Sequence, residues 1–426
     1  MAKSFNRRHS FWYEQLLFSA VFQFVAGFIV VVLLPNWLNW EGLLSSFSLT
    51  GVRANTLFAN SFAYVFSFFI LHKFKRFPGT QSLPFVMPTV LVSWLLVFSV
   101  FLLSREIEYS RPVLLGSFTL AVAWSFFSIF LSRRFFKPKL ALVPFGRALE
   151  LADTPHALIS VLENTDISHR RYDGIVADLH AEDLPDEWER FLARCTLSSI
   201  PVYHTQQLIE AFTGRVRIDH LSENSFGSLQ PSVLYSALKR LVDFACVFLL
   251  SPIFIPIMLV TAVLIKLDSK GAVFYTQQRM GFRGKAFTMY KFRSMRNDIK
   301  GKGFTNGESD PRITNVGTVI RKYRIDELPQ ILNVLKGEMS FIGPRPESLE
   351  LSIWYEKDVP FFSYRHIVRP GLSGWAQVNQ GYAAEVEGMI VKLQYDFYYI
   401  KNFSLWLDIL IVAKTIRTIL TGFGSR

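Results

Sequence analysis

Cysteine is scarce in this chain of 426 residues: only Cys195 and Cys246 occur, far apart in the sequence. A disulfide framework and a cysteine-rich metal site are therefore excluded. The sequence also lacks helix-turn-helix, zinc and single-strand-stacking signatures, so its net charge of +12 does not indicate nucleic-acid binding. No small-residue cleavage site follows the first apolar run, and we expect that run to be an anchor rather than a removed signal peptide.

Charged residues make up only 19% of the chain, whereas half of it is hydrophobic and 15% is aromatic. This composition is typical of a protein with several membrane segments. Four apolar runs in the first third each approach the roughly 20 residues that a spanning helix requires. They cover residues 11–34, 53–71, 83–103 and 112–131. We therefore predict a four-helix transmembrane bundle over residues 1–135.

The distribution of basic residues predicts the orientation of this bundle. Lysines and arginines are frequent before the first run, after the second and after the fourth, whereas the other loops offer only Arg53, Arg105 and Arg111. The basic residues before the first run and after the second and fourth are Lys3, Arg7, Arg8, Lys73, Lys75, Arg76, Arg133, Arg134, Lys137 and Lys139. The positive-inside rule then places both ends of the bundle in the cytoplasm, where anionic lipid is the expected partner of these charges.

Residues 136–232 are more polar, and short apolar runs alternate in them with a helical pattern. The apolar runs cover residues 140–143, 174–177, 200–203 and 216–218, and the helical pattern covers residues 185–195. This alternation predicts a small α/β domain. Its Val143-Pro-Phe-Gly146-Arg turn has one glycine where a dinucleotide-binding turn has several. A structural or oligomerising role, such as forming a homodimer, is therefore favoured over cofactor binding.

A fifth apolar run, residues 241–267, has basic residues on both sides, so a straight crossing would leave one basic flank outside. Ser251-Pro252 and Pro256 lie in its middle, and proline should break the helix there. The Ser251 hydroxyl can bond a carbonyl group that the break leaves unpaired. We predict a re-entrant helix over residues 240–267 that enters from the cytoplasmic face, turns at Ser251-Pro252 and returns. An ordinary kinked span is the alternative.

The segment 405–420 is amphipathic. Its polar side holds Asp408, Lys414, Thr415, Arg417 and Thr418, and its apolar side holds Ile409, Val412, Ile416, Ile419 and Leu420. Such a helix lies naturally in a membrane interface. Packing against the protein core is the alternative.

Two adjacent carboxylates stand in the segment Arg324-Ile-Asp326-Glu327-Leu-Pro329-Gln. Residues 315–323 predict one helix, and a second is expected to begin with Asp326 as N-cap. The arginines around the pair are Arg312, Arg321, Arg324, Arg345 and Arg369. A carboxylate pair among cations suits an anionic, metal-bound substrate such as a nucleotide diphosphate. We expect the cations to hold the carboxylates ionised and nucleophilic; helix capping alone is the alternative.

Two further motifs accompany the pair: Lys291-Phe-Arg293-Ser-Met295, and Arg369-Pro370-Gly371-Leu-Ser-Gly374-Trp375-Ala-Gln377-Val. Gly371 and Gly374 would allow backbone N–H groups to approach an anion, with Arg369 adding charge. Trp375 would stack on a uracil or anchor the chain at the membrane interface. His366 is isolated, which favours a structural or solvated role over a catalytic one.

These motifs resemble those of the bacterial sugar transferases, from about residue 239 to residue 408. Larger members of that family carry an N-terminal bundle and a degenerate Rossmann-like domain before a mixed α/β catalytic domain, expected here at residues 233–426. One departure is Gln380-Gly381, where the family often has Gly-Arg after Val-Asn. An arginine contact made there by the family therefore does not transfer to this chain.

The resemblance implies transfer of a hexose 1-phosphate from a UDP-sugar to undecaprenyl phosphate, with release of UMP. It makes Asp326 the nucleophile and Glu327 the partner of Mg²⁺. Its motifs supply the substrate-binding residues Lys291, Arg293, Arg312, Arg321, Arg324, Arg345, Arg369, Gly371, Gly374, Trp375 and Gln377. We expect a bacterial inner-membrane enzyme with a cytoplasmic active site, which starts exopolysaccharide, capsule or O-antigen synthesis. A transporter and a nucleotide-dependent oxidoreductase or sensor are the rival classes.

Overall fold

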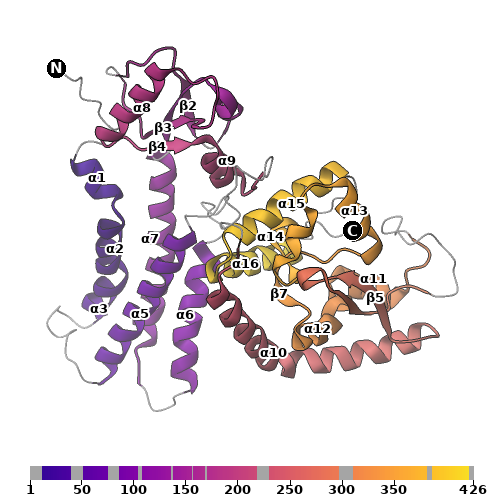
Figure 1. Cartoon of the computed structure of the whole chain (residues 1–426). Coiled ribbons are helices and arrows are strands. Elements are labelled where there is room, and N and C mark those ends of the chain that lie inside the picture. Colours follow the sequence, from indigo (N-terminus) through magenta and orange to yellow (C-terminus); the bar gives the residue numbers. More distant parts are fainter. Residues whose placement is uncertain are drawn as a thin grey trace. The chain divides into compact units, whose positions relative to one another are not determined.

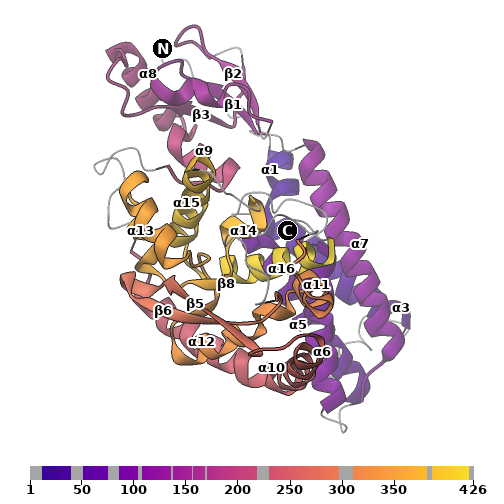
Figure 2. The same cartoon turned by 90° about the vertical axis from the view of Figure 1, so that its right-hand side faces the viewer.

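Figures 1 and 2 show the computed structural model of the chain. It describes residues 12–39, 51–74, 86–103, 108–135, 138–155, 157–167, 170–217, 230–296, 310–380 and 386–421. The chain divides into two units, Met1–Gly214 and Arg215–Arg426. The three-part division into residues 1–135, 136–232 and 233–426 stays a prediction.

The first unit begins with apolar helices. They are α1 (Trp12–Phe18), α2 (Ala20–Phe28), a π-helical turn (Ile29–Leu33), α3 (Leu34–Asn39), α5 (Gly51–Phe74), α6 (Val86–Leu103) and α7 (Arg111–Phe135). Ala20–Asn39, Gly51–Lys73 and Arg111–Phe130 are long and apolar enough to cross a membrane, and α6 adds a shorter apolar stretch. The predicted apolar helices are confirmed. Lys3, Arg7, Arg8, Lys75, Arg76, Arg105 and Lys137, used to predict the orientation, lie outside the described residues.

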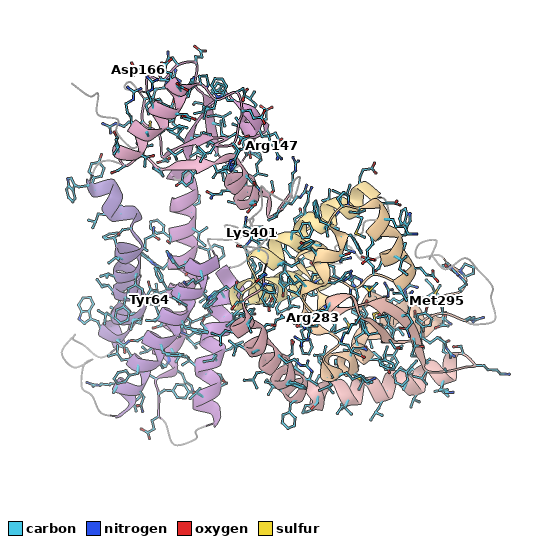
Figure 3. All side chains as sticks on the ribbon, in the orientation of Figure 1. Tyr64, Arg147, Asp166, Arg283, Met295 and Lys401 are labelled. Carbon is cyan, nitrogen blue, oxygen red and sulfur yellow. The ribbon has the colours of Figure 1, made fainter. Side chains whose placement is uncertain are left out.

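Small residues and aromatic rings fill the interior of this bundle. Ala63 is fully buried, and Tyr64, labelled in Figure 3, donates its hydroxyl hydrogen to the Phe24 carbonyl oxygen at 3.0 Å. Small residues allow helices to approach closely in a membrane, where packing replaces the hydrophobic effect. Large apolar side chains point outward and are exposed, among them Phe58, Phe62, Leu95, Leu115, Phe127 and Phe130. An apolar exterior of this kind suits the hydrocarbon of a bilayer.

The rest of the first unit is a small α/β domain with a parallel sheet in the order β2-β1-β3-β4. Its strands are β1 (Lys139–Leu142), β2 (Leu158–Val161), β3 (Gly174–Ala177) and β4 (Val202–His204). Trp188 of α8 (Asp186–Leu197) packs on one face of the sheet, and Leu208 of α9 (Thr205–Thr213) packs on the other. Parallel sheets are usually covered by helices on both faces, and α8 and α9 cover this one. The predicted α/β domain is confirmed.

The sequence analysis missed β2 and predicted a strand that does not form. β2 is an edge strand whose residues are only partly buried. The apolar run at residues 216–218 contains no strand at Val216 or Arg217. Val216 instead donates its N–H to the Gln394 carbonyl oxygen at 3.0 Å, and Ile218 lies outside the described residues.

The second unit combines helices with two small sheets. The helices are α10 (Val233–Asp268), α11 (Asn315–Lys322), α12 (Ile331–Lys336), α13 (Leu349–Asp358), α14 (Trp375–Asn379), α15 (Val386–Lys401) and α16 (Leu405–Thr421). An antiparallel hairpin joins β5 (Phe274–Met280) to β6 (Ala286–Phe292), and β7 (Ser340–Ile342) pairs in parallel with β8 (Gly371–Ser373). Met289, Val247 and Val334 share a buried core that holds β6 between α10 and α12. The predicted mixed α/β character is confirmed.

Helix α10 contains Pro252 and Pro256 and continues through both of them. Figure 1 shows that it changes direction part-way along its length. Ser251 Oγ donates to the Phe248 carbonyl oxygen at 2.7 Å. That carbonyl is the one whose usual donor, the N–H of residue 252, is missing because the residue is proline. The hydrogen bond predicted for Ser251 is therefore present, whereas the predicted break is wrong, because the helix bends without ending.

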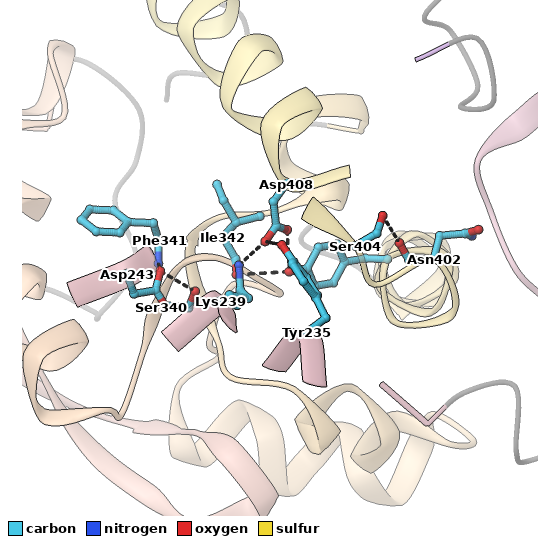
Figure 4. Close-up of polar contacts among 10 residues, drawn as sticks. Tyr235, Lys239, Asp243, Ser340, Phe341, Ile342, Asn402, Ser404 and Asp408 are labelled. Atoms are coloured by element: carbon cyan, nitrogen blue, oxygen red, sulfur yellow. Dashed lines mark hydrogen bonds and ion pairs between the residues drawn. The ribbon is translucent and has the colours of Figure 1, made fainter. Parts of the chain in front are cut away.

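A buried polar cluster fastens the start of α10 to the C-terminal helix (Figure 4). Lys239 forms an ion pair with Asp408 of α16, and both residues are buried. Tyr235 and Tyr399 donate their hydroxyl hydrogens to the same carboxylate, at 2.7 and 2.9 Å. Four groups from α10, α15 and α16 thus satisfy one another.

The next turn of the same helix is fastened to β7 (Figure 4). Asp243 accepts hydrogen bonds from the Ser340 hydroxyl at 3.1 Å and from the Phe341 N–H at 3.2 Å. Tyr235, Lys239 and Asp243 follow one another at intervals of four residues, so they lie on one face of α10. That face is buried by polar contacts, while much of the remaining helix surface is apolar and exposed.

Helix α16 shows the predicted amphipathic pattern. Its polar side faces the protein, where Lys414 Nζ donates to Asn379 Oδ1 at 2.6 Å. Ile409, Val412 and Ile416 are exposed. The side chains of Arg417, Ile419 and Leu420 lie outside the described part of the chain. The exposed apolar side is suited to a membrane interface, as the sequence predicts.

Replacing Asp408 should destabilise the second unit strongly. Asp408→Ala leaves the Lys239 ammonium group buried without its counter-charge, which typically costs about 3–5 kcal/mol. We expect the midpoint of thermal unfolding, measured in detergent, to fall by about 10 °C. Asp358→Ala, which removes an exposed carboxylate from α13, is the control and should change it little. Equal effects of the two variants would contradict the anchoring role of Asp408.

Candidate active site

Three cations from three separate segments surround the carboxylate of Glu327. Glu327 Oε1 lies 3.1 Å from Lys291 Nζ of β6 and 2.8 Å from Arg345 Nη2, which follows β7. Glu327 Oε2 lies 3.5 Å from Arg324 Nη1. Glu327 is 8% exposed, so these charges neutralise a buried group. We call Lys291, Arg324, Arg345 and Glu327 the Glu327 cluster.

The turn that carries the two carboxylates is held against β6 by a buried asparagine. Asn333 of α12 accepts a hydrogen bond from the Tyr290 N–H at 3.2 Å and donates one to the Thr288 carbonyl oxygen at 2.7 Å. Asn333 thereby substitutes for a neighbouring strand along this stretch of β6. The turn residues are consequently fixed next to Lys291, the residue that follows Tyr290.

Asp326 is not the N-cap that the sequence predicts. Arg324 adopts a left-handed conformation with φ of 57° and occupies the cap position of a 3₁₀ turn, Ile325–Gln330, that leads into α12. This conformation costs a non-glycine residue on the order of 1 kcal/mol. The turn thus begins before Asp326, and no side-chain hydrogen bond caps it. Pro329 lies inside this turn rather than in the first turn of α12.

The two adjacent carboxylates have different environments. Burial alone would raise the pKa of Glu327, but its three cations, Arg345 foremost, together lower that pKa below the usual range. Asp326 is partly exposed, and burial followed by the charge of Glu327 raises its pKa to about 6. Lys291, Arg345 and Arg321 lower the pKa of Asp326 by less than burial and Glu327 raise it, because Glu327 has the closest contacts with the cations. Asp326 is still ionised at neutral pH.

Comparison with known proteins identifies the family. Residues 234–422 match the model of the bacterial sugar transferase family. A UDP-N-acetylgalactosamine-undecaprenyl-phosphate N-acetylgalactosaminephosphotransferase of Aeromonas hydrophila is 48% identical over 427 residues, which is 99% of this chain and 100% of that protein. This chain belongs to the bacterial sugar transferase family. A UDP-glucose:undecaprenyl-phosphate glucose-1-phosphate transferase of Xanthomonas campestris pv. campestris is 46% identical over 164 residues, 38% of this chain and 34% of that protein.

A shorter relative is similar to this chain over most of its own length. The UDP-glucose:undecaprenyl-phosphate glucose-1-phosphate transferase of Caulobacter vibrioides is 38% identical over 198 residues. These residues make up 46% of this chain and 74% of that protein. Relatives named for two different sugars thus share the family with this chain.

Two arginines predicted for the sugar transferase site make structural contacts. Arg293 is buried, and its guanidinium group donates to the carbonyl oxygens of Ser269 and Lys270 at 2.8 and 3.0 Å. It therefore closes the C-terminal end of α10. Arg312 Nη2 lies 2.6 Å from Asp310 Oδ2 within the same short loop. Neither contact involves the carboxylate pair.

Arg321 and Arg369, which were also predicted for the site, lie in different surroundings. Arg321 lies near enough to Asp326 for its positive charge to lower the pKa of that carboxyl group, against the larger effects that raise it. Arg369 Nε donates to the Gly337 carbonyl oxygen at 3.0 Å, and its guanidinium group lies 4.9 Å from the centre of the Phe282 ring. The structure thus brings Lys291, Arg321, Arg324 and Arg345 to the carboxylates and places Arg293, Arg312 and Arg369 in other contacts.

The two glycines predicted to form a phosphate loop are packed against another glycine. A Cβ on Gly371 would lie 2.1 Å from the Gly343 nitrogen, and one on Gly374 would lie 2.4 Å from the Gly343 oxygen. Gly371 donates its N–H to the Pro344 carbonyl oxygen at 3.0 Å, and Gly343 donates its own to Ser373 at 2.8 Å. These glycines allow β7 and β8 to approach closely. The expectation of an open anion-binding loop at Gly371 is wrong, because its N–H already has an acceptor.

Trp375 and Gln377 also lie in the packed part of this unit. Trp375 is 1% exposed, its ring stacks on Tyr398 with centres 5.6 Å apart, and Lys414 Nζ lies 4.2 Å from the ring centre. Stacking on uracil and anchoring in the membrane are both wrong for this residue, since protein encloses it. Gln377 Nε2 lies 3.5 Å from the Leu372 carbonyl oxygen.

A second set of charges behind Arg345 was missed in the sequence. Arg365 Nη2 donates to the Arg345 carbonyl oxygen at 2.9 Å and forms an ion pair with Asp396 Oδ2 at 2.9 Å. Glu347 pairs with Lys392 of α15 and lies 3.6 Å from Arg365 Nη1. Glu347 belongs to the same Gly-Pro-Arg-Pro-Glu segment as Arg345, which was the one available signal. No sequence pattern connects that segment to Asp396.

The chemistry of the carboxylate pair is compatible with Mg²⁺. The described residues contain no group of three or more histidine, cysteine, aspartate or glutamate residues arranged to hold a metal. Mg²⁺ needs few protein ligands when phosphates and water supply the rest. Glu327 has the longest of its three contacts with Arg324, whose side chain is also the most exposed of the three cations at 39%. A metal ion would therefore displace Arg324 most easily.

Proposed function

We propose that this chain transfers a sugar 1-phosphate from a UDP-sugar to undecaprenyl phosphate through a covalent intermediate on Asp326, with release of UMP. The observation that carries the proposal is a partly exposed Asp326 beside the buried, cation-bound Glu327. The Aeromonas hydrophila relative, similar along its whole length, supports an N-acetylated hexosamine as the sugar.

The first step of the proposed reaction uses the unequal carboxylates. Lys291 and Arg345 are neutralised only in part by Glu327, so they also attract the diphosphate of the substrate. A carboxylate oxygen of Asp326 attacks the phosphorus that carries the sugar, and the bond from that phosphorus to the oxygen bridging to UMP breaks. The electron pair leaves with UMP, and Asp326 becomes an acyl phosphate.

The second step returns the enzyme to its starting state. A phosphate oxygen of undecaprenyl phosphate attacks the same phosphorus, and the bond to the Asp326 oxygen breaks. The products are the lipid-linked sugar diphosphate and the free Asp326 carboxylate. Two successive displacements allow one carboxylate to serve a soluble donor and a lipid acceptor.

Mg²⁺ belongs to this proposal as a partner of the diphosphate. Glu327 would hold it together with phosphate oxygens. When bound, it offsets the negative charge that develops as UMP leaves.

We also propose that α10 is re-entrant and that the active site faces the cytoplasm of a bacterial inner membrane. Three observations support this: α10 bends (Figure 1), Ser251 satisfies the carbonyl that Pro252 leaves unpaired, and basic residues flank both ends of the apolar run 241–267. The exposed apolar side chains of α10 and α16 would enter one leaflet, with the exposed Lys266 near anionic headgroups.

The first unit has supporting roles in the proposal. The bundle anchors the enzyme, and the α/β domain supports the structure or forms a homodimer. The product of the reaction is a lipid-linked sugar that later transferases extend, so we assign the enzyme to the first membrane step of exopolysaccharide, capsule or O-antigen synthesis.

Asp326→Asn should abolish transfer, because an amide cannot accept the phosphoryl group. We expect UMP release to fall by at least about a thousandfold, while the midpoint of thermal unfolding changes little. The unmutated protein incubated with UDP-sugar labelled in its sugar should carry label that hydroxylamine removes. Asp358→Asn serves as a control and should keep full activity. Full turnover by the Asp326 variant would exclude covalent catalysis at this residue.

The rate should depend on pH through Asp326. Because the pKa of Asp326 is raised to about 6, the group becomes protonated and loses its nucleophilicity as pH falls through that value. We expect kcat/KM for UMP release to be constant above about pH 7 and to fall about tenfold per pH unit below pH 6. Glu327→Gln removes one charge that raises this pKa, so the midpoint of its residual activity should move to lower pH. A rate independent of pH between 5 and 7 would contradict this assignment.

Straightening α10 should change the topology. Tags after Met1 and after Arg426 should both report the cytoplasm in the unmutated protein. A double Pro252→Leu, Pro256→Leu variant removes both helix breakers, and the 36 residues of α10 would then measure about 54 Å as a straight helix, enough to span a bilayer. Part of the C-terminal tag should appear in the periplasm, and activity should fall with it. A periplasmic C-terminal tag in the unmutated protein would exclude re-entry.

A further inference from the structure

A small notch opens beside Arg345. Its walls include the apolar residues Met280, Pro344, Pro346, Val368 and Pro370, and Arg365 and His366 add polar groups. The enclosed part holds about one water-sized group. A methyl group or a carbonyl oxygen fits this space, whereas a whole sugar or uracil ring does not.

His366 brings an unpaired nitrogen to this notch. The residue is 8% exposed, and its Nε2 has no hydrogen-bond partner among the described residues. Burial, followed by the charge of Arg365, lowers the pKa of His366 to about 3, so the imidazole is neutral and Nε2 can either accept or donate. The edge of the ring meets Phe362 with centres 5.6 Å apart, which holds its orientation. Buried polar atoms nearly always have a partner, so this nitrogen is available to a group that enters the notch.

Arg345 connects the notch to the carboxylate pair. Its guanidinium group lies 2.8 Å from Glu327, and its backbone carbonyl oxygen is held by Arg365 at 2.9 Å. The residue thus lines the notch while its charged end belongs to the Glu327 cluster. A diphosphate held by that charged end carries its sugar close to the notch.

We propose that the notch receives the N-acetyl tip of the substrate sugar and that His366 Nε2 forms a hydrogen bond to its amide. This inference rests on the proposed function and adds a specificity-determining residue to it. The acetyl methyl group would contact Met280 and Val368, and the amide would give Nε2 its missing partner. A hexose with only a hydroxyl group at the same carbon leaves both the space and the nitrogen unused. His366 therefore selects N-acetylated hexosamines.

The test compares UDP-N-acetylgalactosamine with UDP-galactose, which differ in this one substituent. For His366→Phe, we expect kcat/KM for UMP release from the N-acetylated donor to fall about tenfold and that from UDP-galactose to change less than about twofold. His366→Gln keeps a polar group and should restore part of the loss. Val368→Phe fills the notch while residue 366 stays histidine, and it should produce the same selective loss. Where UDP-galactose is not turned over, its inhibition constant as a competitor replaces kcat/KM.

The possible outcomes separate this inference from the proposed function. An equal loss with both donors, or a weaker inhibition by UMP, would assign the notch to the nucleotide or to folding and overturn the proposal. Unchanged selectivity in His366→Phe and Val368→Phe would overturn it as well. Thermal unfolding of each variant identifies a loss that is due to instability alone. No UMP release from any UDP-sugar by the unmutated protein would instead refute the proposed function.

Discussion

The buried negative charge of Glu327 is the constraint on which the rest of the catalytic unit depends. Removing one partner of a buried ion pair typically costs about 3–5 kcal/mol, so such a group fixes the segments that neutralise it. Here Lys291 comes from the β5–β6 hairpin and Arg345 from the loop after β7. The hairpin, the carboxylate turn and that loop therefore meet at one point. Asp326 lies next to this point without sharing its closest contacts, which explains why two adjacent carboxylates titrate differently.

Arg345 is held at both of its ends, and this fits a group that must meet an anion without rearranging. Glu327 holds the guanidinium group and Arg365 holds the backbone carbonyl oxygen. The close contact of Gly343 with Gly371 joins the base of the same loop to β8. A cation fixed in advance stabilises a developing negative charge without a cost of reorganisation at the moment of reaction. The close glycine contact and the buried charges thus both keep Arg345 in one position.

The sequence predicted the elements that depend on local pattern and failed where distant residues decide. Apolar runs predicted the apolar helices, and the sequence motifs predicted the carboxylate pair with its four cations, Lys291, Arg321, Arg324 and Arg345. The sequence does not show in which direction a side chain points. Trp375 is enclosed by Tyr398 and Lys414, which belong to α15 and α16, and Arg293 faces the end of α10. The N-cap was misplaced because a left-handed Arg324 starts the turn early, which no residue preference predicts for arginine.

The second unit must hold a charged site next to lipid. The polar face of α10 connects the apolar surface of that helix to the site. A bent apolar helix on its own has no fixed position relative to a soluble domain. Tyr235, Lys239 and Asp243 give one face of it three polar contacts, to α16 and to β7. β7 leads directly into the loop that carries Arg345. The depth of α10 in a bilayer would therefore set the height of Arg345 and of the adjacent carboxylates above the lipid, because rigid, buried contacts connect them.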